Sequence, residues 1–453
     1  MNVVRGFALL TVALIASGCA RSQSVPLPPP RPIATEFESY HTPRRPITTA
    51  PVPVEEPAGP MTLRQALALA LMRNPELAGA SWDVRAAEAR QLQASLPPNP
   101  ELEVETENVG GTGVLRGFNS AETTIALGQL IELGGKRMKR TRLAALEQDL
   151  AGWDYEARRI DVYAQTTRAF VDLLAAQHRV ALAEDLMKIS QQVFGTAAER
   201  VNSGKAAPLE RDRAQVALGT SKLELERARR QVEALRQRLA ARWGATRARF
   251  TRAEGELEAV ALIPTAEQLA SLISQNPDIA RWKTEMEQRQ AALALARAKA
   301  IPDVTVRAGL KRLEDTDDTG FLVGFSIALP VFDRNQGGIR ESSYKLAKAV
   351  EERREAEARA HSNLADAYQL LSAAFVETTI LRNDALPAAQ RAFDSANEGY
   401  RQGKFPYLDV LDAQRTLFEL KGQYIESLAA YHRAAADVER LVGQDLKSIT
   451  EQK

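Results

Sequence analysis

The sequence is poor in the residues from which metal and catalytic centres are built. Among its 453 residues there is one cysteine, and the four histidines are scattered without metal-ligand spacing, at His41, His178, His361 and His432. A single cysteine excludes an internal disulfide, and this inventory offers no zinc or copper cage. No Ser-His-Asp arrangement, paired catalytic carboxylates or phosphate-binding glycine loop can be recognised. We therefore expect no enzyme, no cofactor and no resident metal.

An excess of charge and an abundance of aromatic residues are missing as well. Lys and Arg total 59 against 58 Asp and Glu, a net charge of +1, and aromatic residues make up 6%. Without a basic excess to neutralise phosphates, nucleic acid is not an expected partner. Ala, Glu, Arg, Gln and Leu are abundant instead, which is typical of long helices and coiled coils.

The N-terminal 60 residues read as targeting and spacing segments. Residues 1–19 combine a basic start, an apolar run too short to span a bilayer and small residues before Cys19, which is typical of a secretory signal. The lone Cys19 resembles the acylated cysteine of a lipobox, although an incidental cysteine in an ordinary cleavage region is the alternative. Residues 20–60 are proline-rich, so we expect an extended tether between a lipid anchor and the folded body.

An internal duplication organises the remainder of the chain. Asn-Pro-Glu at 74–76 recurs as Asn-Pro-Asp at 276–278, and Gly204-Lys205 recurs as Gly403-Lys404. Each half runs helix, two strands, long helix, turn, helix, as expected for a fused repeat. The predicted segments are repeat 1 over 61–244, a linker over 245–263, repeat 2 over 264–444 and a C-terminal tail over 445–453.

Four segments alternate apolar and polar residues with a period of two. They are expected as strands over about 101–109, 121–130, 303–311 and 320–330. Strands of this length with one apolar side fit a transmembrane β-barrel, and the alternative is a pair of soluble hairpins packed on a core. Bacterial barrels need at least about eight strands, so several chains would share one barrel, and three chains would supply twelve.

The helical segments are unusually long. Residues 136–202 contain no proline, and at about 1.5 Å per residue such a helix is roughly 100 Å long and needs coiled-coil partners. The shorter helices 75–96 and 208–243 sum to nearly the same length and can run antiparallel to it. Pro387 predicts a kink or break near 384–387 in the second long helix. The predicted fold class is mainly α with a small β part: a helical coiled-coil barrel carrying four membrane strands per chain.

Two similar turns end the long helices. Gly204 and Gly403 are expected to terminate one helix, and the next begins near Pro208 or Tyr407, which places hairpin tips at about 202–208 and 401–407. Asp409 and Asp412 stand three residues apart and so share a helix face. By themselves they are ordinary acids at a helix N-terminus, where the dipole favours them.

The repeat, the Gly-Gly strand-to-helix junctions and the segment 399–414 resemble the TolC-type outer membrane factors of tripartite efflux pumps, over about residues 61–444. The stretch 132–137, Glu-Leu-Gly-Gly-Lys-Arg, is similar to the CzcC-type branch that serves heavy-metal export. The resemblance implies a homotrimer with a barrel of twelve strands in the lipid of the bacterial outer membrane and a helical duct through the periplasm. A periplasmic adaptor and an inner-membrane RND pump would open its closed tip.

Cargo and even the presence of a pore have alternatives. The resemblance favours heavy-metal cations, but the same fold also serves multidrug efflux and type I secretion. A reading of a different class is a periplasmic coiled-coil scaffold lipoprotein without a pore. Four amphipathic strands of membrane length argue for the channel, because a scaffold has no need of them.

The resemblance also assigns roles to residues at the tip. Asp409 and Asp412 correspond to the aspartate rings of the pore constriction, where six carboxylates in a trimer would favour cations. Tyr400 and Glu210 correspond to a bonded pair that holds the closed state, which we call the latch. The arginine that completes the latch in the family is replaced here by Phe405. Candidate contacts for the adaptor are the turn residues Gly204, Lys205, Leu209, Gly403, Lys404 and Leu408.

Overall fold

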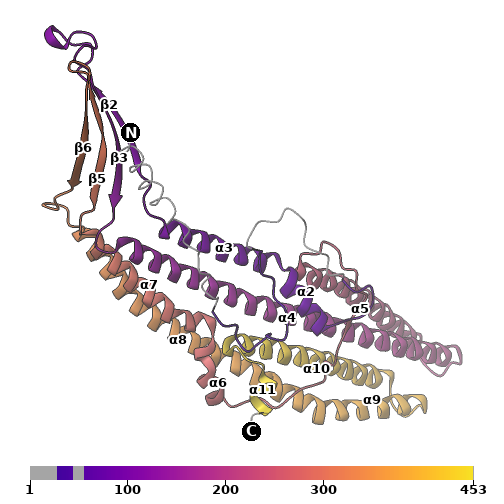
Figure 1. Cartoon of the computed structure of the whole chain (residues 1–453). Helices are drawn as coiled ribbons and strands as arrows, with labels where there is room; N and C mark the ends of the chain where they lie inside the picture. Colours follow the sequence, from indigo (N-terminus) through magenta and orange to yellow (C-terminus); the bar gives the residue numbers. More distant parts are fainter. Residues whose placement is uncertain (1–27, 44–55, 452–453) are drawn as a thin grey trace. The chain divides into compact units, whose positions relative to one another are not determined.

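A computed structural model describes residues 28–43 and 56–451. Two compact units divide the described chain. One contains Asp83–Trp153 and Arg281–Glu355, and the other contains Pro29–Trp82, Asp154–Ala280 and the segment that begins at Ala356. The proposed lipidation site, Cys19, lies outside the described residues. Figure 1 shows the elements of each unit.

The first unit carries one antiparallel sheet of four strands. They are β2 (Glu101–Glu107), β3 (Glu122–Ile131), β5 (Val304–Leu313) and β6 (Asp318–Ile327), in the order β2-β3-β5-β6 (Figure 1). The strands lie within a few residues of the predicted segments. Pairing of β3 with β5 joins a strand of each half of the chain, so the sheet is built from both repeats.

One face of this sheet is a continuous apolar surface. Leu102 pairs with Leu127, Leu127 with Ala308, and Ala308 with Val323, so the apolar positions of all four strands share one side. The largest of these side chains are exposed in the single chain: Phe321 is 77% exposed and Phe325 is 80% exposed. The predicted alternation is therefore present, and the apolar face has no cover within its own unit.

The opposite face of the sheet carries charges linked across strands. Arg307 on β5 reaches over β3 to Glu103 on β2, with Nη1 and Oε2 2.8 Å apart. Lys311 pairs in the same way with Glu107, at 3.5 Å between Nζ and Oε2. Arg307 crosses over Gly128 of β3, where a Cβ would stand 3.5 Å from Arg307 Cγ, an ordinary van der Waals contact. Acidic and basic residues thus alternate along a polar face held together by ion pairs.

Four long helices have residues in both units. They are α3 (Pro75–Ser95), α4 (Lys136–Asn202), α7 (Pro277–Lys299) and α8 (Gln336–Ile380). The predicted proline-free helix 136–202 is α4. At the sheet end, Lys136 Nζ lies 2.7 Å from Asp303 Oδ1, which also accepts the backbone N–H of Leu133. No helix of the described ranges combines the length and the apolar character needed to cross a membrane.

The second unit contains the remaining helices and a small parallel sheet. The helices are α2 (Leu63–Arg73), α5 (Pro208–Ala240), α6 (Ala266–Leu272), α9 (Leu386–Arg401), α10 (Tyr407–Val442) and α11 (Leu446–Glu451). The irregularity predicted before Pro387 is a π-helical stretch, Leu381–Ala385, between α8 and α9. The helix continues instead of breaking, because a π turn can absorb the hydrogen bond that proline cannot make.

The predicted linker and tail are packed on the second unit. Within 245–263, strand β4 (Ala253–Glu254) pairs with β1 (Met61–Thr62), and Phe250 is fully buried. In the tail, Leu446 and Ile449 of α11 are buried against α10. Apolar side chains in short segments have no periodicity, so their burial could not be predicted from pattern.

Part of the predicted tether is likewise folded onto the body. We call residues 28–43 the strap. Its Ile33 is buried, and the Ile33 N–H donates to the carbonyl of Gly443 at 3.0 Å. The Tyr40 N–H donates to Leu71 O at 3.0 Å, and Thr42 N–H donates to Ser81 Oγ at 2.8 Å. The strap therefore connects the end of repeat 2 to the beginning of repeat 1.

A half-buried acid in the second unit makes folding stability depend on pH. Burial, together with the nearby Asp445 carboxylate, raises the pKa of Glu439 to about 8, while the Leu446 N–H donates to Glu439 Oε1 at 3.1 Å. The folded chain thus keeps a proton that the unfolded chain releases above its ordinary pKa. Stability should fall as pH rises from about 5 to about 8.

Glu439→Gln should flatten this dependence and raise the melting temperature at the alkaline end, because the amide needs no proton to stay neutral. Thermal unfolding of the wild type and the variant at both ends of the window measures it. An equal slope in the two proteins would show that Glu439 does not retain the proton. Glu258→Gln is a matched change at an exposed glutamate of the same unit.

Candidate functional site

The two hairpin turns predicted from the sequence lie in the second unit, between α4 and α5 and between α9 and α10 (Figure 1). Gly204 has φ of 71° and Gly403 has φ of 76°, the left-handed conformation that ends helices and that glycine adopts without strain. After each turn the next helix begins, with Pro208 or Tyr407 as its first residue. The turns are therefore built alike in both repeats.

Behind the turns the two hairpins share an apolar core. Tyr400 and Tyr407 are each 2% exposed, and their ring centroids are 5.7 Å apart at 54°. Around them pack small and apolar side chains of α4, α5, α9 and α10: Val193, Ala197, Ala214, Ala389, Phe393, Ala396, Val410 and Leu417. Burying two tyrosine rings between the hairpins ties repeat 1 to repeat 2 at this end of the unit.

The proposed latch residues Tyr400 and Glu210 are in contact. The Tyr400 hydroxyl donates to Glu210 Oε2 at 3.2 Å, which links the end of α9 to the beginning of α5. Burial and the Glu210 carboxylate raise the pKa of Tyr400 to about 12. The phenol therefore remains protonated at neutral pH and can act as the donor. The structure brings the pair together, and its role in closing a pore stays a proposal.

The other predicted tip residues are on the surface. Asp409 and Asp412 are exposed on the first turns of α10, on the same side of the helix. Lys205 and Lys404 follow the two turn glycines and are exposed, and Leu209 and Leu408 are 55% and 54% exposed. These predicted residues thus present two carboxylates, two ammonium groups and two leucines to solvent or to a partner.

Sequence reasoning missed Arg200 as a contact of the latch tyrosine. Its guanidinium stands over the Tyr400 ring, with Cζ 4.8 Å from the centroid, and its Nη1 donates to Tyr400 O at 3.0 Å. A signal was available, because superposing the two turn glycines sets Arg200 of repeat 1 on Gly399 of repeat 2. Because repeat 1 has an arginine where repeat 2 has a glycine, only repeat 1 can make a side-chain contact from this position.

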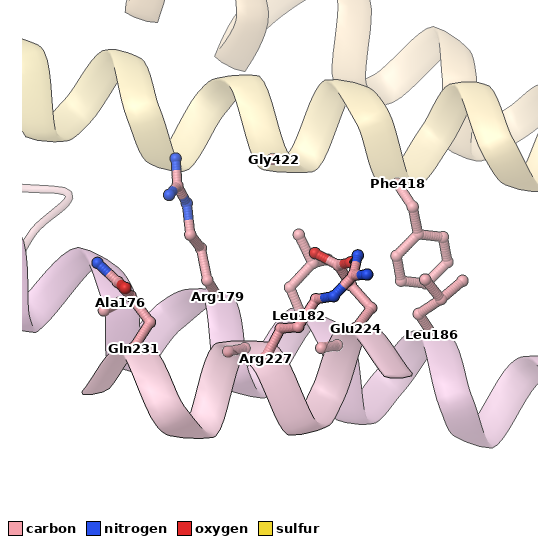
Figure 2. Close-up of a pocket in the computed structure, with 11 residues that line it drawn as sticks. Ala176, Arg179, Leu182, Leu186, Glu224, Arg227, Gln231, Phe418 and Gly422 are labelled. Atoms are coloured by element: carbon pink, nitrogen blue, oxygen red, sulfur yellow. The ribbon is translucent and has the colours of Figure 1, made fainter. Parts of the chain in front are cut away.

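A groove lies farther along the same bundle, between α4, α5 and α10 (Figure 2). It has a volume of about 480 Å³, and alanine, leucine and phenylalanine side chains line it together with charged and polar ones. Arg179, Glu224 and Arg227 stand at its rim, and Phe418 of α10 closes one end (Figure 2). Arg179 is itself paired with Glu426 of α10, at 2.5 Å.

Metal-ligating side chains do not gather in the part of the chain that the structure describes: no group of three or more His, Cys, Asp or Glu residues there could hold an ion. The two predicted pore carboxylates of each chain, Asp409 and Asp412, are exposed. Alone they attract cations without enclosing one.

Comparison with known proteins identifies a family and several relatives with similar sequences. The family model described as "Outer membrane efflux protein" matches residues 66–245 and 269–444. The cobalt-zinc-cadmium resistance protein CzcC of Cupriavidus metallidurans is 35% identical, over 87% of this chain and 94% of that protein. The nickel-cobalt-cadmium resistance protein NccC of Alcaligenes xylosoxydans xylosoxydans is 28% identical over 65% of this chain and 66% of that protein.

Among solved structures, that of CusC, whose title concerns folding and transmembrane channel formation, has a TM-score of 0.73 at 18% identity, covering 89% of this chain and 99% of that one. The likeness shows that the two chains share a fold. From the match over both repeats and the shared fold, the chain belongs to the outer membrane efflux protein family and resides in the bacterial outer membrane.

Proposed function

We propose that three copies of this chain form the outer membrane duct of a tripartite efflux system. The observation that carries the proposal is the four-stranded sheet, whose apolar face is exposed and whose edge strands β2 and β6 have no further partner among the described residues. Lipid cannot satisfy the N–H and C=O groups of an open edge. Joining three such sheets edge to edge pairs every edge and directs every apolar face outward, in a closed barrel of twelve strands.

The helical surface supports assembly as well. On α5, Leu209, Val216 and Leu223 recur at heptad spacing and are 55%, 69% and 62% exposed. A heptad stripe of this kind is the seam of a coiled coil. Within one chain it faces no partner helix, and in a ring of chains it packs on the neighbouring subunit.

At the tip, the trimer brings together the carboxylates of Asp409 and Asp412. Three chains place six of them around the axis, which raises the local concentration of cations and opposes anions. The Tyr400–Glu210 bond keeps the hairpins of each chain together in the closed state. A periplasmic adaptor contacts the turns, including Lys205 and Lys404, and opens the tip when an inner-membrane RND pump engages it.

The proposed cargo is a divalent heavy-metal cation. It rests on the similarity to CzcC and NccC, whose names describe resistance to cobalt, zinc, cadmium and nickel, and on the acidic tip. The chain is a passive conduit, and the energy comes from the pump. Acylation of Cys19 would fasten the N-terminus to the membrane.

Deleting the gene should lower tolerance to cobalt, zinc and cadmium, and the intact gene should restore it. Growth of the deletion strain over a concentration series of each metal, and of a panel of drugs, measures both transport and cargo. Sensitivity to drugs alone would move the cargo to multidrug efflux. Unchanged growth on every compound, together with water-soluble monomers in place of trimers in outer membrane fractions, would contradict the channel and favour a scaffold.

A further inference from the structure

We propose that Arg200 is the arginine of the latch in this chain, and that it works from the first hairpin instead of from the second turn. The inference deepens the proposed function and rests on it. The position that carries the family's arginine holds Phe405, so the closed tip lacks that contact. Arg200, on the first hairpin, supplies a cation to Tyr400 on the second hairpin.

Arg200 makes two distinct contacts with Tyr400. Its guanidinium carbon lies 4.8 Å from the ring centroid, within the range of a cation–π interaction. Its Nη1 donates to the backbone carbonyl of Tyr400 at 3.0 Å. That carbonyl lies in the last turn of α9, where the helix dipole concentrates partial negative charge, so a cation is favoured there.

Tyr400 consequently joins three segments. Its ring is covered by Arg200 from the end of α4, its hydroxyl donates to Glu210 on α5, and its face meets Tyr407 on α10. The Nε atom of Arg200 is buried without a hydrogen-bond partner among the described residues. The side chain is therefore held by the tyrosine and not by a carboxylate, which makes the contact weak enough to be broken by a partner.

Phe405, which stands in the place of the family's arginine, packs on the end of α9. Its ring lies over Gly399, where a Cβ would stand 2.1 Å from Phe405 Cδ2. The backbone N–H groups of Lys404 and Phe405 both donate to Gly399 O, at 2.7 Å and 3.3 Å. The aromatic ring is folded back onto its own helix, so it shapes the turn, and the cationic contact comes from repeat 1.

Opening the tip separates the α9–α10 hairpin from the α4–α5 hairpin, so it must break the Arg200 and Glu210 contacts of Tyr400. Removing either contact should shift the equilibrium toward the open tip. The two contacts share Tyr400 as their partner, so their losses should be coupled and not simply additive.

The test is single-channel conductance of the purified full-length protein in planar lipid bilayers, with trimer content checked on unheated gels. Arg200→Met keeps the aliphatic packing and removes the cation. It should raise the open fraction about tenfold, the size of one desolvated cation–π contact. Tyr400→Phe removes the hydroxyl bond and retains the ring, and Arg200→Lys should recover part of the closure because an ammonium group also sits on aromatic faces.

Arg401→Met is the matched control. Arg401 follows Tyr400 directly and is exposed, so its loss removes the same charge at the same level of the tip. An open fraction unchanged in Arg200→Met would overturn the inference, as would an equal rise in Arg401→Met, because the effect would then be one of charge. If the wild-type protein makes no channel at all, the proposed function fails instead.

Discussion

A trimer carrying Asp409→Ala and Asp412→Ala together should lose most of its preference for cations over anions. Both carboxylates are exposed on the first turns of α10, and three chains lose six negative charges in one narrow ring. Clefts lined by charge of one sign raise the local counter-ion concentration about 10- to 1000-fold. We expect the cation-to-anion permeability ratio to fall at least about tenfold, and block by divalent cations to disappear.

Reversal potentials in planar bilayers under a salt gradient measure this ratio directly. A matched double variant is Glu199→Ala with Asp212→Ala, which removes two exposed acids from the other hairpin. The permeability ratio of that control should change little, because those acids are not placed at the constriction. Equal selectivity of the Asp409/Asp412 variant and the wild type would remove these residues from the pore.

Glu156→Ala should cause the largest loss of stability of any single change described here. Glu156 and Arg159 form an ion pair whose side chains are 5% and 3% exposed, with Arg159 Nη2 2.7 Å from Glu156 Oε1. Removing the acid leaves a buried guanidinium unpaired, which costs about 3–5 kcal/mol. The same change should release the strap, because Glu156 Oε1 also accepts the Arg31 N–H at 2.6 Å and Arg159 donates to Ile33 O at 3.0 Å.

Thermal unfolding of the purified protein measures the first effect, and hydrogen exchange of residues 28–43 measures the second. Glu88→Ala is the control, since Glu88 pairs with Arg85 at the same helical spacing but with about a quarter of each side chain exposed. It should cost no more than about 1 kcal/mol. Strap amides that remain protected in Glu156→Ala would show that the pair does not hold the strap.

The double change Glu156→Ala with Arg159→Met separates charge from packing. It removes both charges and leaves an apolar side chain in the place of the guanidinium, so much of the lost stability should return. The strap should nevertheless remain loose, because its backbone N–H and C=O groups have lost their partners. Recovery of both properties would mean that the strap is held by its apolar contacts, chiefly Ile33.

Local pattern was enough for the regular elements of this chain. The proline-free run became α4, the alternating segments became β2, β3, β5 and β6, and glycines ended helices at Gly204 and Gly403. These features depend on neighbours a few residues apart, through helical and strand periodicity and through backbone freedom at glycine. The pairing of Tyr400 with Glu210 was also predicted, but from family resemblance and not from pattern.

Contacts between distant segments could not be predicted in this way. The strap, β4 and α11 are short or irregular, and their apolar residues follow no period, so they were expected as parts of a tether, a linker and a tail. In the sequence, Arg200 is an ordinary arginine near the end of a helix. Its contact with Tyr400 joins residues that are 200 positions apart, so local pattern does not reveal it.

The amino-acid sequence by itself determined which segments are helices and strands, where the hairpins turn and that the chain is duplicated, because each of these is encoded in spacing along the chain. The expectation of an efflux protein with Asp409 and Asp412 at its tip came from family resemblance. The tertiary structure alone decided that the strap, linker and tail belong to the folded body and that Arg200 covers Tyr400. Those outcomes depend on which surfaces meet when the two repeats fold together, and residue spacing along the chain does not determine which surfaces meet.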